Sequence, residues 1–270
     1  MEIRTLRLSS LLRAVVLICM LLCSGAPVSD ARWRKWIGRV CNPFTSAYGP
    51  WLSGKATFYS GGDQGNACGY GRLTGAIFGR NFAAVSPRIY LGGLACGMCL
   101  EVKCVGHPGC RRGVARVTVT DLCPARPPNM AFCAGGKLHL DLGRDVFPVI
   151  CNPRVGVAPI RFRAVPCARY RTLNIILNGN RYGYMAIVVM SIPGSGRVIR
   201  MDVRGRGGRN WEPLRRDWGA TFMRTGRPLR YPVSIRVSIL GKLCRLIARN
   251  CIKGQFFNGR KLSCSYSASI

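Results

Sequence analysis

Two short stretches near the middle of the chain alternate apolar and polar residues. In Val117–Leu122, valines alternate with threonines up to Asp121. In Leu138–Leu142, three leucines alternate with His139 and Asp141. A period of two is typical of a half-buried strand, because successive side chains point to opposite faces. The pattern therefore predicts two strands that present Asp121 and Asp141 from an apolar frame.

These two carboxylates are candidate functional groups because acids are scarce in this chain. It holds ten Asp and Glu against 41 Lys and Arg. An Asp at a strand end is as often only a turn former or a satisfied hydrogen-bond acceptor. Either Asp alone leaves both interpretations open, and the cysteine pattern around the pair favours the functional one.

Strand-like patterns recur along the rest of the chain. Lys55–Tyr59 precedes the two acids, and Ile160–Val165 follows them. Asn178-Gly179-Asn180 is a hairpin signal. Strands at this spacing, with polar turns between them, predict an antiparallel sandwich or barrel in the second half. The runs expected there are residues 173–177, 185–190, 198–203, 221–223, 233–240 and 244–248.

The chain divides into segments of different character. Residues 1–31 combine early arginines with the apolar run Ala14–Cys23, which is too short to span a bilayer and is typical of a secretory signal peptide. We expect the protein to be secreted and soluble, because no second apolar run reaches spanning length. The expected segments after the signal are a basic tether (32–50), a first domain (51–165), a second domain (166–260) and a polar tail (261–270).

The cysteine content and the net charge limit which metal sites, cofactors and partners are expected. The chain has 15 cysteines and a net charge of +31. Export permits disulfides, so Cys96-Gly-Met-Cys99 is interpreted as disulfide-forming rather than as a zinc or redox motif, and no metal or cofactor is expected. Removal of the signal leaves thirteen cysteines, so at least one is free or pairs between chains. The charge favours acidic partners, but no nucleic-acid-binding motif accompanies it.

The order of several short motifs resembles the expansins of plant cell walls. Each motif is weak alone, but their order and spacing are specific over residues 51–259. Cys123 with Cys133, and Gly254-Gln-Phe-Phe, make the chain similar to the alpha-expansin group. The motifs are Ala56–Tyr59, Ala67–Gly71, Cys96–Cys104, Thr120-Asp121, His139–Leu142 and Val165–Cys167.

The resemblance implies an all-β fold of two domains. The first would be a six-stranded double-psi beta-barrel, similar to family-45 endoglucanases. The second would be an immunoglobulin-like beta-sandwich carbohydrate-binding module, and the two would form one long groove for a glucan chain. The family pattern also implies the disulfides Cys68–Cys96, Cys99–Cys167, Cys104–Cys110 and Cys123–Cys133. Five cysteines lie outside that pattern: Cys41, Cys151, Cys244, Cys251 and Cys264.

The resemblance places Asp141 at the general acid of the related hydrolases. Inverting hydrolysis needs a second carboxyl group. The hydrolases carry it on the first barrel strand, whereas Ala56–Ser60 has none, and Asp63 lies in a glycine-rich loop that would hold a base poorly. We therefore expect no enzyme, but acid-dependent loosening of contacts between cellulose and matrix glucans. Asp141 and Asp121 would be the groove acids, and the lining residues would be Thr57, Tyr59, Tyr70 and His139.

The second domain is expected to stack sugar rings on exposed aromatic side chains. Tyr182 and Tyr184 alternate and so would share a face of one strand, although Tyr184 fits a core position equally well. The resemblance places Trp218 at a platform position and Phe222 where alpha-expansins often have Trp. The expected partners are cellulose, xyloglucan and acidic pectin. We expect the protein to bind them as a monomer in the plant cell wall.

Two other functions remain open. A weak inverting endoglucanase would use Asp141 as the acid and Asp121 or Asp63 as the base, and would release reducing ends from soluble glucan. A basic secreted defence protein that binds polysaccharide would resemble the barwin-type proteins. Those proteins share the barrel but lack the second domain, so the second half of the chain argues against this function.

Overall fold

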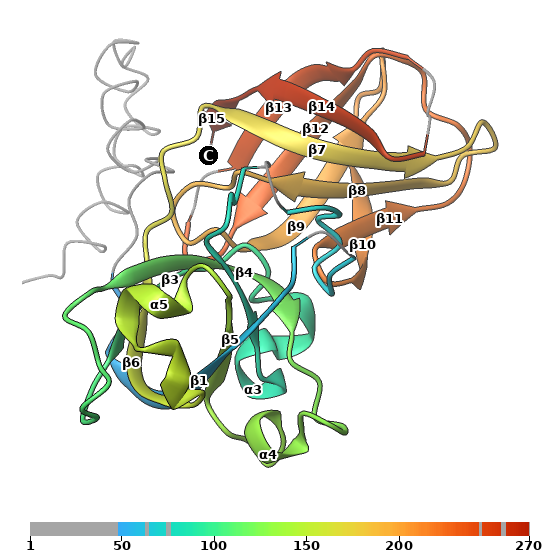
Figure 1. The fold of residues 1–270 in the computed structure, drawn as a ribbon. Helices are drawn as coiled ribbons and strands as arrows, with labels where there is room; N and C mark the ends of the chain where they lie inside the picture. Colours follow the sequence, from blue (N-terminus) through green and yellow to red (C-terminus); the bar gives the residue numbers. More distant parts are fainter. Residues whose placement is uncertain (1–47, 63–64, 74–76, 243–244, 255–257, 270) are drawn as a thin grey trace, which may run out of the picture. The chain divides into compact units, whose positions relative to one another are not determined.

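The described part of the chain forms a closed barrel followed by a β-sandwich (Figure 1). The computed structural model describes residues 48–62, 65–73, 77–242, 245–254 and 258–269. All of these belong to one compact unit, Cys41–Ile270. The architecture confirms the predicted all-β fold class. The expected signal peptide, most of the tether, Cys41, Asp63 and Cys244 lie outside the described residues.

Six strands close the barrel in the order β1-β5-β2-β4-β3-β6. β1 runs parallel to β5 and β2 runs parallel to β4, while the other neighbouring pairs are antiparallel. Strands far apart in sequence therefore become neighbours in the barrel. The strands are β1 (Leu52–Tyr59), β2 (Phe82–Val85), β3 (Cys99–Cys104), β4 (Ala115–Leu122), β5 (His139–Gly143) and β6 (Ala158–Val165).

Alternation along the strands fills the barrel. Val117 and Val119 of β4 and Leu140 and Leu142 of β5 are all buried in the core, as the period-two pattern predicts. Only short helices connect the strands, and none in the described residues is long and apolar enough to cross a membrane. They are α3 (Pro87–Tyr90), η1 (Leu91–Gly93), α4 (Met130–Cys133), α5 (Phe147–Ile150) and η2 (Pro153–Val155).

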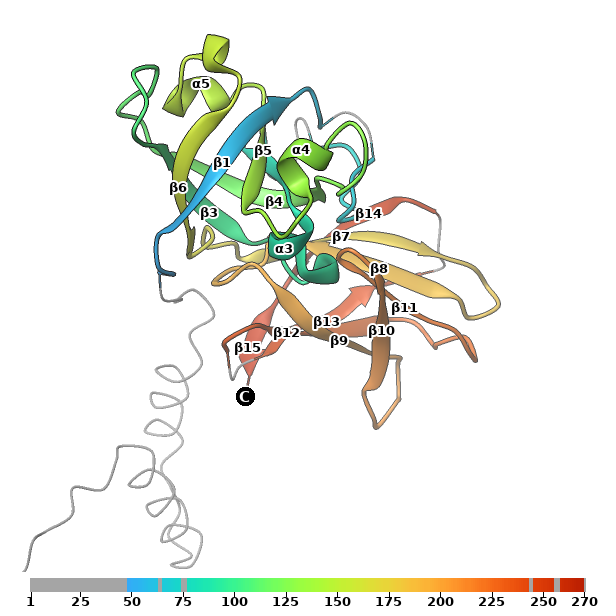
Figure 2. The ribbon, with the colours of Figure 1, turned by 90° about the horizontal axis from the view of Figure 1, so that it is seen from below.

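Nine strands form the sandwich in the order β14-β7-β8-β11-β10-β9-β12-β13-β15. β10 pairs with β11 on one side and β9 on the other, so the sheet turns over at β10 into two layers (Figure 2). Apolar side chains of both layers meet in one core. The strands are β7 (Thr172–Gly179), β8 (Met185–Met190), β9 (Val198–Arg204), β10 (Glu212–Trp218), β11 (Thr221–Arg224), β12 (Val233–Ile239), β13 (Arg245–Ile252), β14 (Arg260–Ser265) and β15 (Ser267–Ser269).

The end of the chain belongs to the sandwich. β14 pairs with β7 and β15 pairs with β13, so the expectation of a polar tail outside the sheet is wrong. Cys264 is buried and forms a disulfide with Cys251, and Leu262 packs against the same core. Two inward residues are sufficient to anchor this strand, although its other side chains are polar.

Five disulfides stabilise the described residues. Four have the pairings that the family pattern implies: Cys68–Cys96, Cys99–Cys167, Cys104–Cys110 and Cys123–Cys133. The fifth, Cys251–Cys264, joins β13 to β14 and accounts for two of the cysteines outside that pattern. Within the described residues, Cys151 is a free, buried thiol.

Barrel and sandwich share apolar and backbone contacts. Ile176, Val188 and Met190 of the sandwich belong to the same core cluster as the barrel residues. The Cys167 amide donates to the Gly194 carbonyl at 2.8 Å. At Gly196, where φ is +73°, an added Cβ would lie 2.0 Å from the Gly97 carbonyl oxygen. Only glycine permits both this backbone conformation and this close approach.

Candidate functional site

The strand order brings three polar side chains together at one edge of the barrel. Thr57 on β1 pairs with Asp141 on the neighbouring strand β5. Ala84 on β2 pairs with Asp141 on one side and with Asp121 on β4 on the other. Neighbouring strands lie about 4.8 Å apart, so the backbones of the two acids are separated by about 10 Å along the sheet. The small side chain of Ala84 lies between them.

A hydrogen-bonded chain leads from His139 to Asp141. The Thr57 hydroxyl donates to Asp141 Oδ1 at 2.9 Å, and Thr57 Oγ1 lies 2.8 Å from His139 Nε2. Because the hydroxyl has only one proton to donate, His139 must donate from Nε2 when Asp141 is ionised. Burial lowers the pKa of His139 to about 4, and the charges of Lys55 and Lys137 act in the same direction. The imidazole is therefore a neutral donor that fixes the Thr57 hydroxyl on Asp141.

Asp121 is held by the backbone. Its Oδ1 accepts hydrogen bonds from the amides of Ala67 at 2.7 Å and Leu122 at 2.8 Å. The first of these bonds joins β4 to the loop between β1 and β2. Burial raises the pKa of Asp121 above its ordinary value, and the two amide bonds oppose that rise. Asp121 therefore combines the two roles considered above, a structural acceptor and a partly buried acid.

Burial also makes Asp141 a weaker acid than usual. It raises the pKa of Asp141, the charge of Asp121 adds to the rise, and the Thr57 hydrogen bond opposes it. Beside the two acids, burial and then their charges raise the pKa of Tyr59. The site therefore contains a carboxyl that gains a proton at a higher pH than an ordinary Asp does, and a phenol that remains protonated.

Family models and known sequences match both halves of the chain. One model, described as Expansin C-terminal domain, matches residues 173–252, and another, described as Lytic transglycolase, matches residues 82–162. Putative expansin-A30 of Oryza sativa subsp. japonica is 37% identical over 186 residues, which are 64% of this chain and 69% of that protein. Expansin-A7 of Arabidopsis thaliana is 32% identical over 214 residues, 74% of this chain and 80% of that protein. The chain belongs to the expansin family.

A bacterial expansin has the same two-part fold. The crystal structure of the apo Clavibacter michiganensis expansin aligns with a TM-score of 0.61 and 24% sequence identity, covering 79% of this chain and 95% of that one. At this identity the likeness concerns the fold alone. The resemblance to expansins noted in the sequence is thus confirmed by the sequence relatives, and the two-domain architecture by the fold.

Three aromatic or imidazole groups expected to line the expansin groove are buried. Tyr70 is 3% exposed, with its ring centroid 4.9 Å from that of Phe78 in the core shared by barrel and sandwich. Phe222 is 2% exposed in the sandwich core, and His139 is 1% exposed behind Thr57. Direct contact of these three with a polymer is therefore a wrong expectation. Each is covered by a second layer that the sequence pattern does not reveal.

Among the described residues, the expansin sandwich places the expected platform aromatics Trp218, Tyr182 and Tyr184 at two sites. Trp218, 51% exposed, ends β10, and its ring lies against Gly69 in the loop that holds Asp121. Tyr182, 72% exposed, and the half-buried Tyr184 lie in the turn between β7 and β8. They are not on one strand, so the expectation of a shared strand face is wrong. Of these three side chains, only Trp218 lies beside the loop that holds Asp121.

Two residues that position the site were not expected from the sequence. Ala84 leaves space between the acids, and Tyr90 donates its hydroxyl to the Ala67 carbonyl at 2.6 Å. Tyr90 thus fixes the residue whose amide holds Asp121. Neither residue carries a sequence signal, because a small strand residue and a buried helical tyrosine are ordinary in any core.

Proposed function

We propose that this chain loosens plant cell walls without hydrolysis, by disrupting contacts between cellulose and matrix glucans in acidic conditions. One observation carries the proposal. The side chain that Asp141 meets on the first barrel strand is the Thr57 hydroxyl, and β1 holds no carboxylate. Inverting hydrolysis needs a carboxylate to activate water opposite the acid, and a hydroxyl held by a neutral imidazole does not serve as that base.

The proposed action is competition for hydrogen bonds. When Asp141 is protonated, its acidic hydrogen becomes available to a glucan oxygen, while Thr57 holds the carboxyl in place. The raised pKa of Asp141 moves this change toward the mildly acidic range, so activity rises as pH falls through that pKa. Tyr59 remains a neutral donor, and Asp121 completes the row of polar groups. Polymer chains then slip because their mutual contacts are replaced, and no covalent bond breaks.

Trp218 would extend the binding surface toward the sandwich. An exposed indole is a stacking platform for a pyranose face, and this one lies beside the loop that holds Asp121. The crystal structure of a variant of the bacterial expansin contains cellohexaose. By extension we propose cellulose and xyloglucan as partners of this chain, acting as a monomer outside the cell. The net charge of +31 adds attraction to acidic wall polymers.

The test is creep of heat-inactivated plant wall strips under constant load at acidic pH, with reducing sugars assayed in the same bath. Wild type is expected to extend the wall without releasing sugar, and Asp141→Asn to lose most of the extension. Asn keeps the shape of the side chain but has no acidic proton. Full extension by Asp141→Asn, at an unchanged thermal unfolding temperature, would remove Asp141 from the mechanism.

A weak endoglucanase is the second candidate, because the two acids flank Ala84. Their backbones lie two strand spacings apart, about 10 Å, which leaves room for carboxyl groups at the roughly 6.5–9.5 Å that inverting hydrolysis uses. In that case Asp121 would activate water. Sugar release in the same bath, lost in both Asp141→Asn and Asp121→Asn, would establish the hydrolase and overturn the non-hydrolytic proposal.

A further inference from the structure

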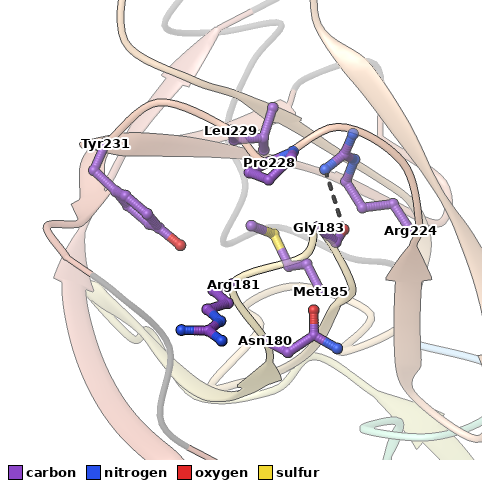
Figure 3. A pocket seen from close by; sticks show the side chains of 8 residues that line it. All are labelled: Asn180, Arg181, Gly183, Met185, Arg224, Pro228, Leu229 and Tyr231. Atoms are coloured by element: carbon purple, nitrogen blue, oxygen red, sulfur yellow. Dashed lines mark hydrogen bonds between the residues drawn. The ribbon is translucent and has the colours of Figure 1, made fainter.

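A pocket of about 340 Å³ lies in the sandwich between the β7–β8 turn and the loop that follows β11 (Figure 3). Figure 3 shows the Arg181 guanidinium and the Tyr231 hydroxyl facing the same space, with Met185 beside it. The volume is at the small end of ligand pockets, which hold about 300–1,000 Å³. The described residues that line it are Asn180, Arg181, Gly183, Met185, Arg224, Pro228, Leu229 and Tyr231.

The pocket is separate from the Asp121–Asp141 site. Met185, the first residue of β8, lines the pocket, whereas Met190, its last residue, packs in the core shared with the barrel. Five residues of extended strand span about 17 Å. The pocket therefore lies at the end of β8 away from the barrel, and a ligand there would not cover the acids.

Three sets of contacts fix the turn and the loop that form the pocket. At Gly183, where φ is +103°, an added Cβ would lie 1.7 Å from the Gly226 carbonyl oxygen, so turn and loop touch. Asn180 Oδ1 accepts from the amides of Tyr182 at 2.9 Å and Tyr184 at 3.3 Å, which shapes the turn. Arg224 donates to the Arg227 carbonyl at 3.1 Å and ties the loop to its own strand.

The charge inside the pocket is positive and only partly balanced. Arg224 pairs with Glu212 at 3.0 Å, so its charge is compensated. Arg181 has no carboxylate within ion-pair distance in the described residues; its Nη2 donates to the Tyr182 hydroxyl at 2.8 Å, and its guanidinium stacks on that ring at 5.0 Å. Among the described residues that line the pocket, none is acidic. Exposed Arg227 and Arg230 on the same loop add to the positive field.

The lining matches an acidic sugar. Met185, Pro228 and Leu229 supply apolar surface for the C–H groups of a pyranose ring, and Asn180 and Tyr231 supply polar groups for its hydroxyls. A guanidinium fork binds a carboxylate through two parallel hydrogen bonds. We propose that this pocket binds a uronic acid residue of an acidic polysaccharide, with Arg181 on the carboxylate. The chain would then hold a charged matrix polymer at one site while acting on neutral glucan at another.

Calorimetric titration with trigalacturonic acid tests the proposal, and it does not depend on wall extension. Arg181→Gln is expected to weaken binding at least about tenfold, because one charge-assisted contact is lost. Arg181→Lys keeps the charge but loses the fork of parallel N–H donors. Its affinity is expected to lie between those of wild type and Arg181→Gln. The matched control is Arg209→Gln, an exposed arginine outside the pocket lining that changes net charge equally. It is expected to change affinity less than about twofold.

Two further titrations test whether binding depends on the carboxylate of the sugar rather than on the rest of the trisaccharide or on negative charge in general. The methyl ester of the same trisaccharide is expected to bind wild type about tenfold more weakly, because the ester cannot accept the charged fork. Sodium sulfate, compared with sodium chloride at equal ionic strength, is expected not to displace the acid trisaccharide. Equal losses in Arg181→Gln and Arg209→Gln would show diffuse charge attraction, and displacement by sulfate would show a general anion site. Either result, or no binding of the trisaccharide, overturns the proposal.

Discussion

Asp121 acts on Asp141 through space, and this defines a test at the scale of single residues. In Asp121→Asn the amide oxygen still accepts from Ala67 and Leu122, so the loop contact is kept. The negative charge that helps to raise the pKa of Asp141 is lost. The pKa of Asp141 is then expected to fall, and the proposed acid-activated limb of wall extension to move to lower pH. Creep measured across a pH series checks this.

Asp121→Asn could instead leave the pH dependence of wall extension unchanged, and that result would contradict the prediction. An unchanged pH profile in Asp121→Asn, with full extension at the acidic plateau, would show that a group other than Asp141 titrates in the active range. Glu101→Gln is a suitable control, because Glu101 is a barrel acid paired with Arg116 and Arg163 rather than with the site. It is expected to leave the pH midpoint of extension unchanged, whatever it does to stability.

His139 makes folding stability depend on pH. Its pKa is about 4 in the folded chain against an ordinary 6.5, so between these values the unfolded state binds the proton and the folded state does not. Stability therefore falls as pH drops through this window and levels off below it. Relative to His139→Gln, wild type is expected to lose about 2 kcal/mol between pH 7 and pH 4.5. Denaturant unfolding at both pH values measures this, and parallel losses in the two proteins would contradict it.

At the residue scale, the sequence located the acids more reliably than the aromatics. Asp121 and Asp141 stand out because a charge in an alternating apolar frame must face outward or be paired. Tyr70 and Phe222 were misplaced because an aromatic ring suits a core and a platform equally well. Which of the two applies depends on the layer packed above it, and that layer comes from residues far away in the sequence.

At the scale of elements, the difference between a buried and an exposed aromatic ring predicts different effects of two substitutions in the sandwich. Phe222 on β11 is 2% exposed, so Phe222→Ala is expected to cost about 3–5 kcal/mol of folding stability through loss of burial and a cavity. Trp218 on β10 is 51% exposed, so Trp218→Ala is expected to cost less than about 1 kcal/mol. Its main effect should be on binding, where one stacked ring contributes about 1 kcal/mol, or about fivefold in affinity.

Thermal unfolding and cellulose pull-down measure these two effects separately. A stable Phe222→Ala with weakened cellulose binding would place Phe222 on the surface and overturn its assignment to the core. Unchanged pull-down by Trp218→Ala would remove the indole from the polymer-binding surface. Tyr182→Ala is the control for an exposed aromatic away from the acids, and is expected to change neither quantity strongly.

Strands with a visible alternation or a long apolar run in the sequence were predictable, and strands without such a pattern were not. β4, β5, β8 and β12 were expected from their alternation or apolar runs. β10 was missed because Leu214 is the one fully buried side chain in it, so no period is visible. The order of strands in the barrel could not be derived from the pattern at all. Parallel pairing of β1 with β5, which brings Thr57 to Asp141, joins residues more than eighty positions apart.

At the scale of the whole molecule, barrel and sandwich are joined where Gly97 meets Gly196. Both glycines have positive φ, and an added Cβ at Gly196 would also lie 2.7 Å from Cys167 Sγ. Neither the backbone nor a disulfide sulfur can move aside cheaply. A side chain here would therefore strain the connection between the two halves without touching the acids or the sandwich core.

Comparison of Gly196→Ala with Gly207→Ala isolates this contact, because both glycines have φ of +73° and only Gly207 has open space around its Cβ. Gly207→Ala is expected to cost about 1–2 kcal/mol from backbone strain alone. Gly196→Ala carries the same strain plus a clash that adds about 1–3 kcal/mol. Chemical denaturation measures both. If polymer must lie across the acids and Trp218 together, Gly196→Ala also lowers wall extension at a temperature where it remains folded, whereas Gly207→Ala does not. Equal stability losses in the two variants would show that the halves do not meet at Gly97 and Gly196.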